Sequence, residues 1–254
     1  MEERKKIIEV ENLSIGYGST TILSQLNFNV YHREILFILG NSGCGKSTLL
    51  KHLIGLYQPQ EGDIKIFGDS IVNASESKKL ELRKKFGVTY QGGALFGSMS
   101  VADNVAFPLR EHTDLTEEEI SRIVEEKLAL ANLAGYGSFM PAELSGGMKK
   151  RAGLARALAL SPGLLFFDEP SAGLDPLASA TLDSLILELR DMLDATIVVV
   201  SHELDSIFST ADRIIMLDKE RKTIVASGDP RTLAESSDDH WVKNFLCRNN
   251  MKRG

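Results

Sequence analysis

The chain has 254 residues, of which 43% are hydrophobic and 25% are charged, and it carries a formal net charge of −6 at pH 7. This length suits one large α/β domain or two small lobes, and the composition is that of an ordinary globular protein. The acidic balance argues against broad nucleic-acid binding, which needs a basic surface, and two cysteines are too few for a disulfide framework.

The apolar runs of the chain are short. The longest, such as residues 164–167 and 197–200, have the length of strands and fall far below the roughly 20 residues that cross a bilayer. Residues 1–6 are too charged for a signal peptide and lack its apolar stretch. We therefore expect a soluble, cytoplasmic chain.

The predicted elements begin with strands and continue as an alternation of strands and helices. Strands are expected at residues 7–10, 22–30, 35–39, 64–67 and 86–90, with helices at 46–56 and 76–85. After a helical stretch, the strand pattern returns at residues 164–167, 196–200 and 214–217, again separated by helices. Such alternation implies an α/β fold with a mostly parallel sheet that is covered on both faces.

The stretch between Gln91 and Ser161 has a helical texture. Thr116 and Glu119 form a capping-box pattern that opens a helix extending to about residue 132, and another helix follows Ser145. No internal repeat or heptad array is evident in the sequence. We therefore interpret this stretch as a helical insert within the α/β core.

A glycine-rich segment lies between a predicted strand and a predicted helix and matches the pattern G-x-x-x-x-G-K-[ST]. It consists of Gly40, Asn41, Ser42, Gly43, Cys44, Gly45, Lys46, Ser47 and Thr48. In this setting the backbone N–H groups surround phosphates, Lys46 neutralises the β and γ oxygens, and Ser47 ligates Mg²⁺. The alternative is a chance match in a simple turn. Since a helix start lowers a thiol pKa, we expect Cys44 to be reactive in the empty loop and shielded by ATP.

Two carboxylates follow the apolar run 164–167. Asp168 and Glu169 come at the carboxyl end of that predicted strand, the edge at which open α/β sheets bind ligands. Asp168 is placed to hold Mg²⁺ through water, and Glu169 to face the γ-phosphate and the attacking water. The alternative is a pair of surface acids that only cap the strand.

Four further residues are ambiguous on local grounds. Asp175 precedes a proline and is a standard helix N-cap, while His202 follows a predicted strand and is equally suited to capping the next helix. Gln91 ends a strand, as many polar residues do. Tyr17 lies in a predicted turn between two glycines, where it either stacks on an adenine or packs.

A second anion site is predicted where Ser145, Gly146 and Gly147 open a helix, because unobstructed backbone N–H groups at a helix start bind anions. It lies about a hundred residues after the glycine-rich loop, which is already a complete phosphate cradle. Two such sites in one domain indicate that the second serves a nucleotide held by another copy of the chain.

Taken together, these residues resemble the nucleotide-binding domain of ATP-binding-cassette (ABC) transporters, and the resemblance covers nearly the whole chain. The matches occur in the family order. They are Tyr17 for the adenine-stacking aromatic, residues 40–48 for Walker A, Gln91 for the Q-loop, residues 145–147 for the signature, Asp168 and Glu169 for Walker B and the catalytic glutamate, residues 171–175 for the D-loop, and His202 for the switch histidine.

The resemblance implies a P-loop NTPase core with a mostly parallel sheet, an N-terminal antiparallel β part and an inserted helical subdomain. The ATPase domain is then expected at residues 1–226. Its core covers about 1–91 and 161–226 and its helical subdomain about 92–160. Residues 227–254 form a C-terminal tail, expected as a helix packed on its own domain or, as the alternative, as a segment that contacts a partner.

The mechanism implied by the resemblance divides the site between two copies. The two copies form a homodimer in the ATP-bound state. Ser145 and Gly147 of one copy contact the γ-phosphate of the ATP that is bound to the other copy. Glu169 orients or deprotonates water, His202 stabilises the transferring phosphate, and Gln91 links Mg²⁺ and water to a transmembrane permease. The implied activity is ATP hydrolysis coupled to transport.

Some segments of the sequence differ from those of common importers, and these segments indicate a particular group within the family. Residues 148–151 read Met-Lys-Lys-Arg, and residues 90–96, 104–111 and 202–208 resemble the ATPases of Mla-type systems. Those work at the cytoplasmic face of the inner membrane with an integral permease, an MCE-domain lipid-binding protein and a STAS-domain subunit. They move phospholipids between the inner and outer membranes. The alternatives are an ATPase for import of a small polar solute, and a soluble ABC ATPase acting on nucleic acid or ribosomes.

Overall fold

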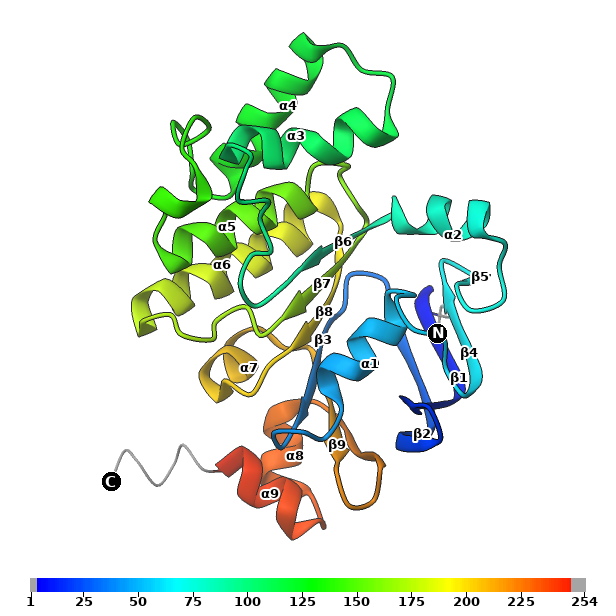
Figure 1. The fold of residues 1–254 in the computed structure, drawn as a ribbon. Coiled ribbons are helices and arrows are strands. Elements are labelled where there is room, and N and C mark those ends of the chain that lie inside the picture. Colours follow the sequence, from blue (N-terminus) through cyan, green and yellow to red (C-terminus); the bar gives the residue numbers. More distant parts are fainter. Residues whose placement is uncertain (1–3, 248–254) are drawn as a thin grey trace.

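The computed structural model describes residues 4–247, which fold into two β-sheets with helices on both sides of the larger one (Figure 1). Residues 1–3 of the charged N-terminus and residues 248–254 of the predicted C-terminal tail lie outside the described residues. None of the helices in residues 4–247 is both long and apolar enough to cross a membrane.

The smaller sheet has four antiparallel strands in the order β2-β1-β4-β5. They are β1 (Lys6–Tyr17), β2 (Thr20–Tyr31), β4 (Glu61–Ile66) and β5 (Asp69–Ser70). This is the antiparallel N-terminal part that the resemblance implied.

Strand β1 is longer than the sequence pattern predicted, because the chain passes through an irregularity and then resumes the sheet. Asn12 has a φ of 48°, which interrupts the apolar alternation, and burial returns at Leu13 and Ile15. Tyr17 then pairs with Thr20 across a tight turn. The prediction that Tyr17 lies in the turn itself was therefore wrong, since it is the last residue of the strand.

The larger sheet has six strands in the order β10-β9-β3-β8-β7-β6. They are β3 (Ile35–Gly40), β6 (Phe86–Thr89), β7 (Leu164–Asp168), β8 (Thr196–Val200), β9 (Arg213–Asp218) and β10 (Thr223–Gly228). All neighbours are parallel except β10, which pairs antiparallel with β9 at the edge. The predicted α/β fold with a mostly parallel sheet is confirmed.

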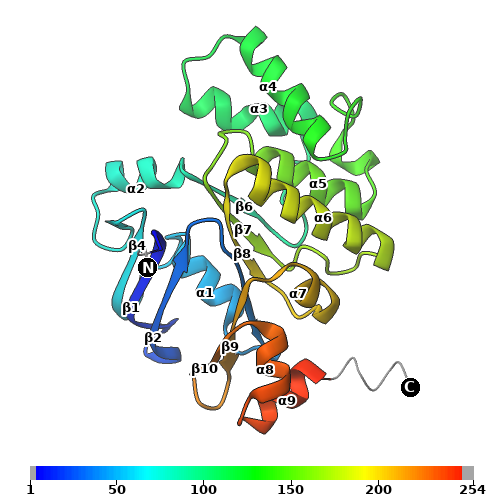
Figure 2. The ribbon, with the colours of Figure 1, turned by 180° about the vertical axis from the view of Figure 1, so that it is seen from behind.

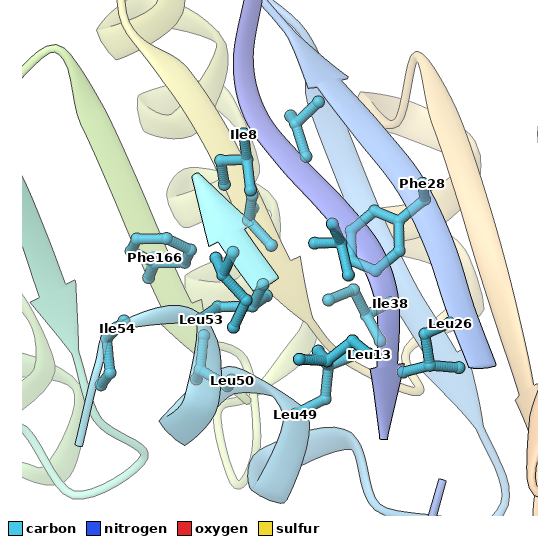
Figure 3. Close-up of a cluster of buried hydrophobic side chains, with 14 of the residues drawn as sticks. Ile8, Leu13, Leu26, Phe28, Ile38, Leu49, Leu50, Leu53, Ile54 and Phe166 are labelled. Atoms are coloured by element: carbon cyan, nitrogen blue, oxygen red, sulfur yellow. The ribbon is translucent and has the colours of Figure 1, made fainter. Parts of the chain in front are cut away.

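Side chains of the larger sheet pack into two separate hydrophobic cores, one on each face of the sheet. On one face, Leu36 and Ile38 belong to a core shared with the smaller sheet and with α1 (Lys46–Leu53). Figure 3 shows Ile38 of this core together with Leu13 and Leu49. On the other face, Ile35 and Phe37 join a second core. Strand β3 is buried at every position because both of its faces are covered, which explains its uninterrupted apolar sequence.

Five further helices cover the second face or lie at the periphery (Figure 2). They are α2 (Glu76–Arg83), α6 (Pro176–Leu193), α7 (Leu204–Thr210), α8 (Pro230–Ser236) and α9 (His240–Cys247). Helix α9 buries Val242 and Leu246 in the second core of its own chain, so the described part of the tail packs on its own domain.

Three helices between the two halves of the core form a third cluster of buried side chains. They are α3 (Val101–His112), α4 (Glu117–Leu130) and α5 (Gly146–Ala157), with a 3-10 turn at Pro141–Glu143. The capping box predicted for Thr116 and Glu119 is present at the start of α4. Helix α5 serves two clusters, because Ala152 and Ala155 face the helices while Leu154 packs on the larger sheet.

Candidate functional site

The glycine-rich loop connects β3 to α1 and curls around the head of its own lysine. Lys46 donates from Nζ to the carbonyl oxygens of Gly40 at 2.9 Å and Asn41 at 3.4 Å. Gly45 is the N-cap of α1 and provides no side-chain cap, so the first-turn amides face the loop. Its φ is 105° and an added Cβ would lie 2.8 Å from Ile22, so only glycine fits there. A loop of this geometry at a helix start can bind an anion such as phosphate.

Cys44 does not behave as its position in the loop predicted. Its side chain is 1% exposed and packs into the first core, and burial raises the pKa of the thiol, which Lys46 only partly offsets. The prediction of a lowered pKa and a reactive thiol was therefore wrong. Desolvation outweighs the favourable field of the helix start, because the thiol points inward.

Ser47 and Asp168 meet beneath the loop. The Ser47 hydroxyl donates to Asp168 Oδ1 at 3.2 Å, and burial raises the pKa of the Asp168 carboxyl while this hydrogen bond opposes the rise. No cluster of three or more His, Cys, Asp or Glu side chains able to hold a metal occurs in residues 4–247. One hydroxyl and one carboxylate fit Mg²⁺ that takes its other ligands from water and phosphate oxygens.

Glu169 and His202 are two predicted site residues whose side chains are in direct contact. His202 Nδ1 lies 2.9 Å from Glu169 Oε2, and the Glu169 side chain is 14% exposed. Glu169 follows β7 and His202 follows the adjacent β8, so both stand at the carboxyl edge of the sheet. The Glu169 amide donates to the carbonyl of Val200 at 2.8 Å, which holds the residue at a φ of 49°. Strained backbone of this kind is common at functional sites.

A cavity of about 410 Å³ joins the loop to this carboxylate–histidine pair. Its lining consists of Gly40, Asn41, Ser42, Lys46, Glu169, His202, Leu204 and Phe245. The sequence reasoning missed Leu204 and Phe245, which add apolar walls from α7 and α9. No local signal could have found Phe245, because only the packing of the C-terminal helix brings it to the loop.

Tyr17 stands at the edge of the loop with 52% of its side chain exposed. Its hydroxyl lies 3.3 Å from the hydroxyl of Thr48, and its ring meets Tyr57 edge to face at a centroid distance of 6.0 Å. An exposed ring steadied on two sides offers a face for a planar base. The sequence reasoning did not include Tyr57.

Ser145, Gly146 and Gly147 lie apart from this cavity, and none of them lines it. Ser145 is the N-cap of α5, and its hydroxyl accepts a hydrogen bond from the amide of Met148 at 3.3 Å. Gly146 and Gly147 form the first turn of that helix rather than preceding it. The structure thus shows a second helix start with small residues, outside the cavity that Lys46 of the same chain lines.

Asp175 and Gln91 also lie outside the cavity lining. Asp175 caps α6, accepting hydrogen bonds from the amides of Leu177 and Ala178, as the helix-start pattern predicted. Gln91 is exposed beyond the end of β6, and no hydrogen bond in residues 4–247 joins it to Asp168. A part for Gln91 in the cation site therefore stays a prediction.

Comparisons with known proteins agree on one family. Residues 23–172 match the family model described as "ABC transporter". The chain is 46% identical over 239 residues to a Mycobacterium tuberculosis protein named "probable ribonucleotide transport ATP-binding protein", covering 94% of this chain and 66% of that relative. It is 43% identical to the "intermembrane phospholipid transport system ATP-binding protein MlaF" of Haemophilus influenzae, covering 92% of this chain and 88% of the relative.

Solved structures of the same kind superpose on this chain. The cbiO1 protein of Clostridium perfringens, described as part of an ABC transporter complex, gives a TM-score of 0.83 at 27% identity, covering 98% of this chain and 97% of its own. The dimeric ATP-binding cassette MJ0796, in a post-hydrolysis state bound to ADP and Pi, gives 0.80 at 27% identity, covering 88% of this chain and 98% of its own. The chain spans only 66–68% of the length of the mycobacterial relatives.

Proposed function

The chain belongs to the ABC transporter family, and from that premise we propose that it binds and hydrolyses ATP as the nucleotide-binding subunit of a transport complex. The observation that carries the proposal is the cavity in which Lys46, Glu169 and His202 meet. A cationic phosphate cradle and a carboxylate base on one cavity are the parts that phosphoryl transfer to water needs.

Each of these residues has a defined task in the proposed reaction. Lys46 exchanges its bonds with the loop carbonyls for bonds to the β- and γ-phosphates. Glu169 orients or deprotonates the attacking water, and His202 steadies Glu169 and stabilises the charge of the transferring phosphate. The apolar walls from Leu204 and Phe245 keep excess water from the reacting groups.

We propose ATP and Mg²⁺ as the ligands of this cavity. Ser47 and Asp168 would hold Mg²⁺, Asp168 through water, and Gln91 would join them when its loop moves toward the cavity. The bound ion would neutralise charge on the phosphate oxygens. Tyr17 would stack on the adenine, since its exposed ring is held by Tyr57 and Thr48.

We further propose a head-to-tail homodimer in the ATP-bound state. Ser145 and Gly147 lie outside the cavity of their own chain, so their helix start would reach the γ-phosphate held by a second copy. Asp175, the N-cap of α6, would lie at the same interface between the two copies. The dimeric cassette MJ0796, bound to ADP and Pi, supports this assembly by its similarity to this chain.

For the transported substrate we propose phospholipid moved between the inner and outer membranes. The support is the identity of 41–43% with proteins named for intermembrane phospholipid transport, over more than nine-tenths of this chain. The second candidate is a small polar solute, because the relatives at 46% identity are named for ribonucleotide transport.

The partners proposed for this function are an integral permease, an MCE-domain lipid-binding protein and a STAS-domain subunit, with no nucleic acid. The chain would then sit peripherally at the cytoplasmic face of the inner membrane. Within it we propose a core of residues 1–91 and 161–226, a helical subdomain of residues 92–160, and a tail from residue 227 that begins within β10.

Purification of the intact complex through a tag on this chain tests the proposal. The complex is reconstituted into vesicles, and ATP hydrolysis is measured with phospholipid acceptor vesicles or with ribonucleotides, beside a Glu169→Gln complex as the inactive control. Lipid transfer that needs ATP and an intact Glu169 supports the phospholipid proposal. Stimulation by ribonucleotides without lipid transfer favours the second candidate, and absence of ATP hydrolysis by the wild-type complex refutes both.

A further inference from the structure

Lys150 joins two parts of the structure that are far apart in the sequence. It lies on α5, and its ammonium donates to the carbonyl oxygen of Pro170 at 2.9 Å and to that of Ala172. These two carbonyls belong to the segment that follows Glu169 directly. A single side chain thus connects the helix that begins at Ser145 to the loop that carries Glu169.

The segment between Glu169 and Asp175 has few other anchors in its middle. Its ends are fixed, because the Glu169 amide donates to Val200 and Asp175 caps α6. Between them, the backbone hydrogen bonds within the described residues are those of tight turns, such as the one from the amide of Ala172 to the carbonyl of Glu169 at 3.2 Å. The hydroxyl of Ser171 is buried without a hydrogen-bond partner in residues 4–247, so it does not hold the loop.

The hydrogen bonds of Lys150 are of a kind that can hold a loop in place. An ammonium that donates to two neutral carbonyls makes charge-assisted hydrogen bonds, which are stronger than bonds between neutral groups. The head of Lys150 is partly buried, and burial lowers its pKa while the nearby carboxylate of Glu169 opposes that shift. The same cation therefore lies in the field of Glu169 without filling the cavity, since Lys150 is not among the residues that line it.

We propose that Lys150 is a positioning residue that fixes the loop carrying Glu169 to the helix that begins at Ser145. This inference rests on the proposed ATP-bound dimer. Ser145 then serves the nucleotide of the partner, and Glu169 the nucleotide of its own chain. Lys150 is five residues from Ser145 on a continuous helix, about 7.5 Å along its axis. Engagement of one nucleotide by Ser145 is thereby transmitted to the catalytic carboxylate at the other.

The test compares three variants with the wild-type complex. Lys150→Met removes every donor and keeps the length of the side chain, whereas Lys150→Arg keeps donors and charge. Lys149→Met is the matched control, because the neighbouring Lys149 makes no side-chain hydrogen bond within the described residues. Steady-state kcat, KM and the Hill coefficient for ATP are measured in the reconstituted complex. The affinity for ATP is measured in the isolated chain, where ATP contacts only the cavity of one copy and not the Ser145 of a partner.

Loss of Lys150 should lower kcat about tenfold or more, because hydrogen bonds to a charged group are lost from a catalytic segment. The Hill coefficient should fall toward 1, while the affinity of the isolated chain for ATP changes less than about twofold. Lys150→Arg should recover part of kcat, and Lys149→Met should match the wild type. Hydrogen–deuterium exchange should show faster exchange in residues 170–175 only for Lys150→Met.

Two results would overturn the inference. One is a Lys150→Met complex whose kcat, Hill coefficient and exchange at residues 170–175 equal those of Lys149→Met. The other is a loss of kcat matched by equal losses of nucleotide affinity and thermal stability, without rescue by arginine, which would indicate a purely structural lysine. Failure of the proposed function looks different, because the wild-type complex itself would then hydrolyse no ATP.

Discussion

Replacing Glu169 by glutamine isolates its carboxylate from everything else that the residue does. Glutamine has nearly the same volume, keeps the amide that donates to Val200, and can still form a hydrogen bond with His202, which lies 2.9 Å from the carboxylate. Only the negative charge and the capacity to take a proton disappear. We expect the variant to bind ATP, to remain in the closed dimer and to hydrolyse ATP very slowly.

Glu169→Gln should change the rate of ATP hydrolysis far more than it changes the free energy of unfolding. Loss of a general base costs about 10²–10⁴ in rate, or roughly 3–5 kcal/mol of barrier. The contact itself contributes little to folding, because the His202 side chain is 56% exposed and an exposed ion pair is worth about 0–1 kcal/mol. The variant should therefore unfold at nearly the same denaturant concentration as the wild type.

Phosphate release measures turnover, and the chain contains its own reporter of binding. Its single tryptophan, Trp241, lies on α9 with its ring centroid 5.7 Å from that of Phe245, which lines the cavity. ATP should change the Trp241 emission in the wild type and in Glu169→Gln with similar midpoints. Turnover of Glu169→Gln above about a tenth of the wild-type rate would refute the assignment of Glu169 as the catalytic base.

Three other predictions follow from burial. Cys44 is 1% exposed and burial raises the pKa of its thiol, so alkylation at about pH 8 should modify the more exposed Cys247 first, with or without ATP. Cys44 should react appreciably only above the usual thiol pKa of 9.0, and peptide mass spectrometry distinguishes the two modified cysteines. Because the folded state holds that proton more tightly, this thiol adds stability at lower pH that is lost as the pH rises past 9.0. Arg213→Met leaves Glu34, with a side chain 1% exposed, without its two-pronged partner and should cost about 3–5 kcal/mol in urea unfolding; a loss below about 1 kcal/mol would contradict this. Asn104→Leu removes the side chain that satisfies the backbone before α3 and should cost about 1–3 kcal/mol for each buried group left unpaired, seen as a lower urea midpoint; an unchanged midpoint would mean that water replaces the amide.

The sequence was informative wherever neighbouring residues act together. The glycine-rich loop requires glycine at fixed places because its backbone turns through positive φ, as at Gly45, and such demands are visible in the sequence itself. Asp168 and Glu169 were found because they follow a fully apolar strand whose carboxyl end had to reach the ligand edge of the sheet. The helix caps at Thr116 and Asp175 are equally local, and both are present in the structure.

The sequence was misleading wherever the environment of a side chain decides its chemistry. Cys44 looked reactive from its place in the loop, but its side chain turns into the core. Strand β10 was not predicted, because an edge strand of half-buried residues lacks a strong apolar pattern. Phe245 and Lys150 gave no sign of their contacts, since their partners lie on elements far away in the sequence.

Residue types at fixed short spacings were enough to predict the α/β fold and the family, and they also nominated the residues proposed to hold phosphate and act on it. Which of those residues share one cavity, and which stand apart from it, became visible in the folded chain. It places His202 against Glu169 and leaves Ser145 outside, because strand order and helix packing set distances between segments that sequence spacing does not record.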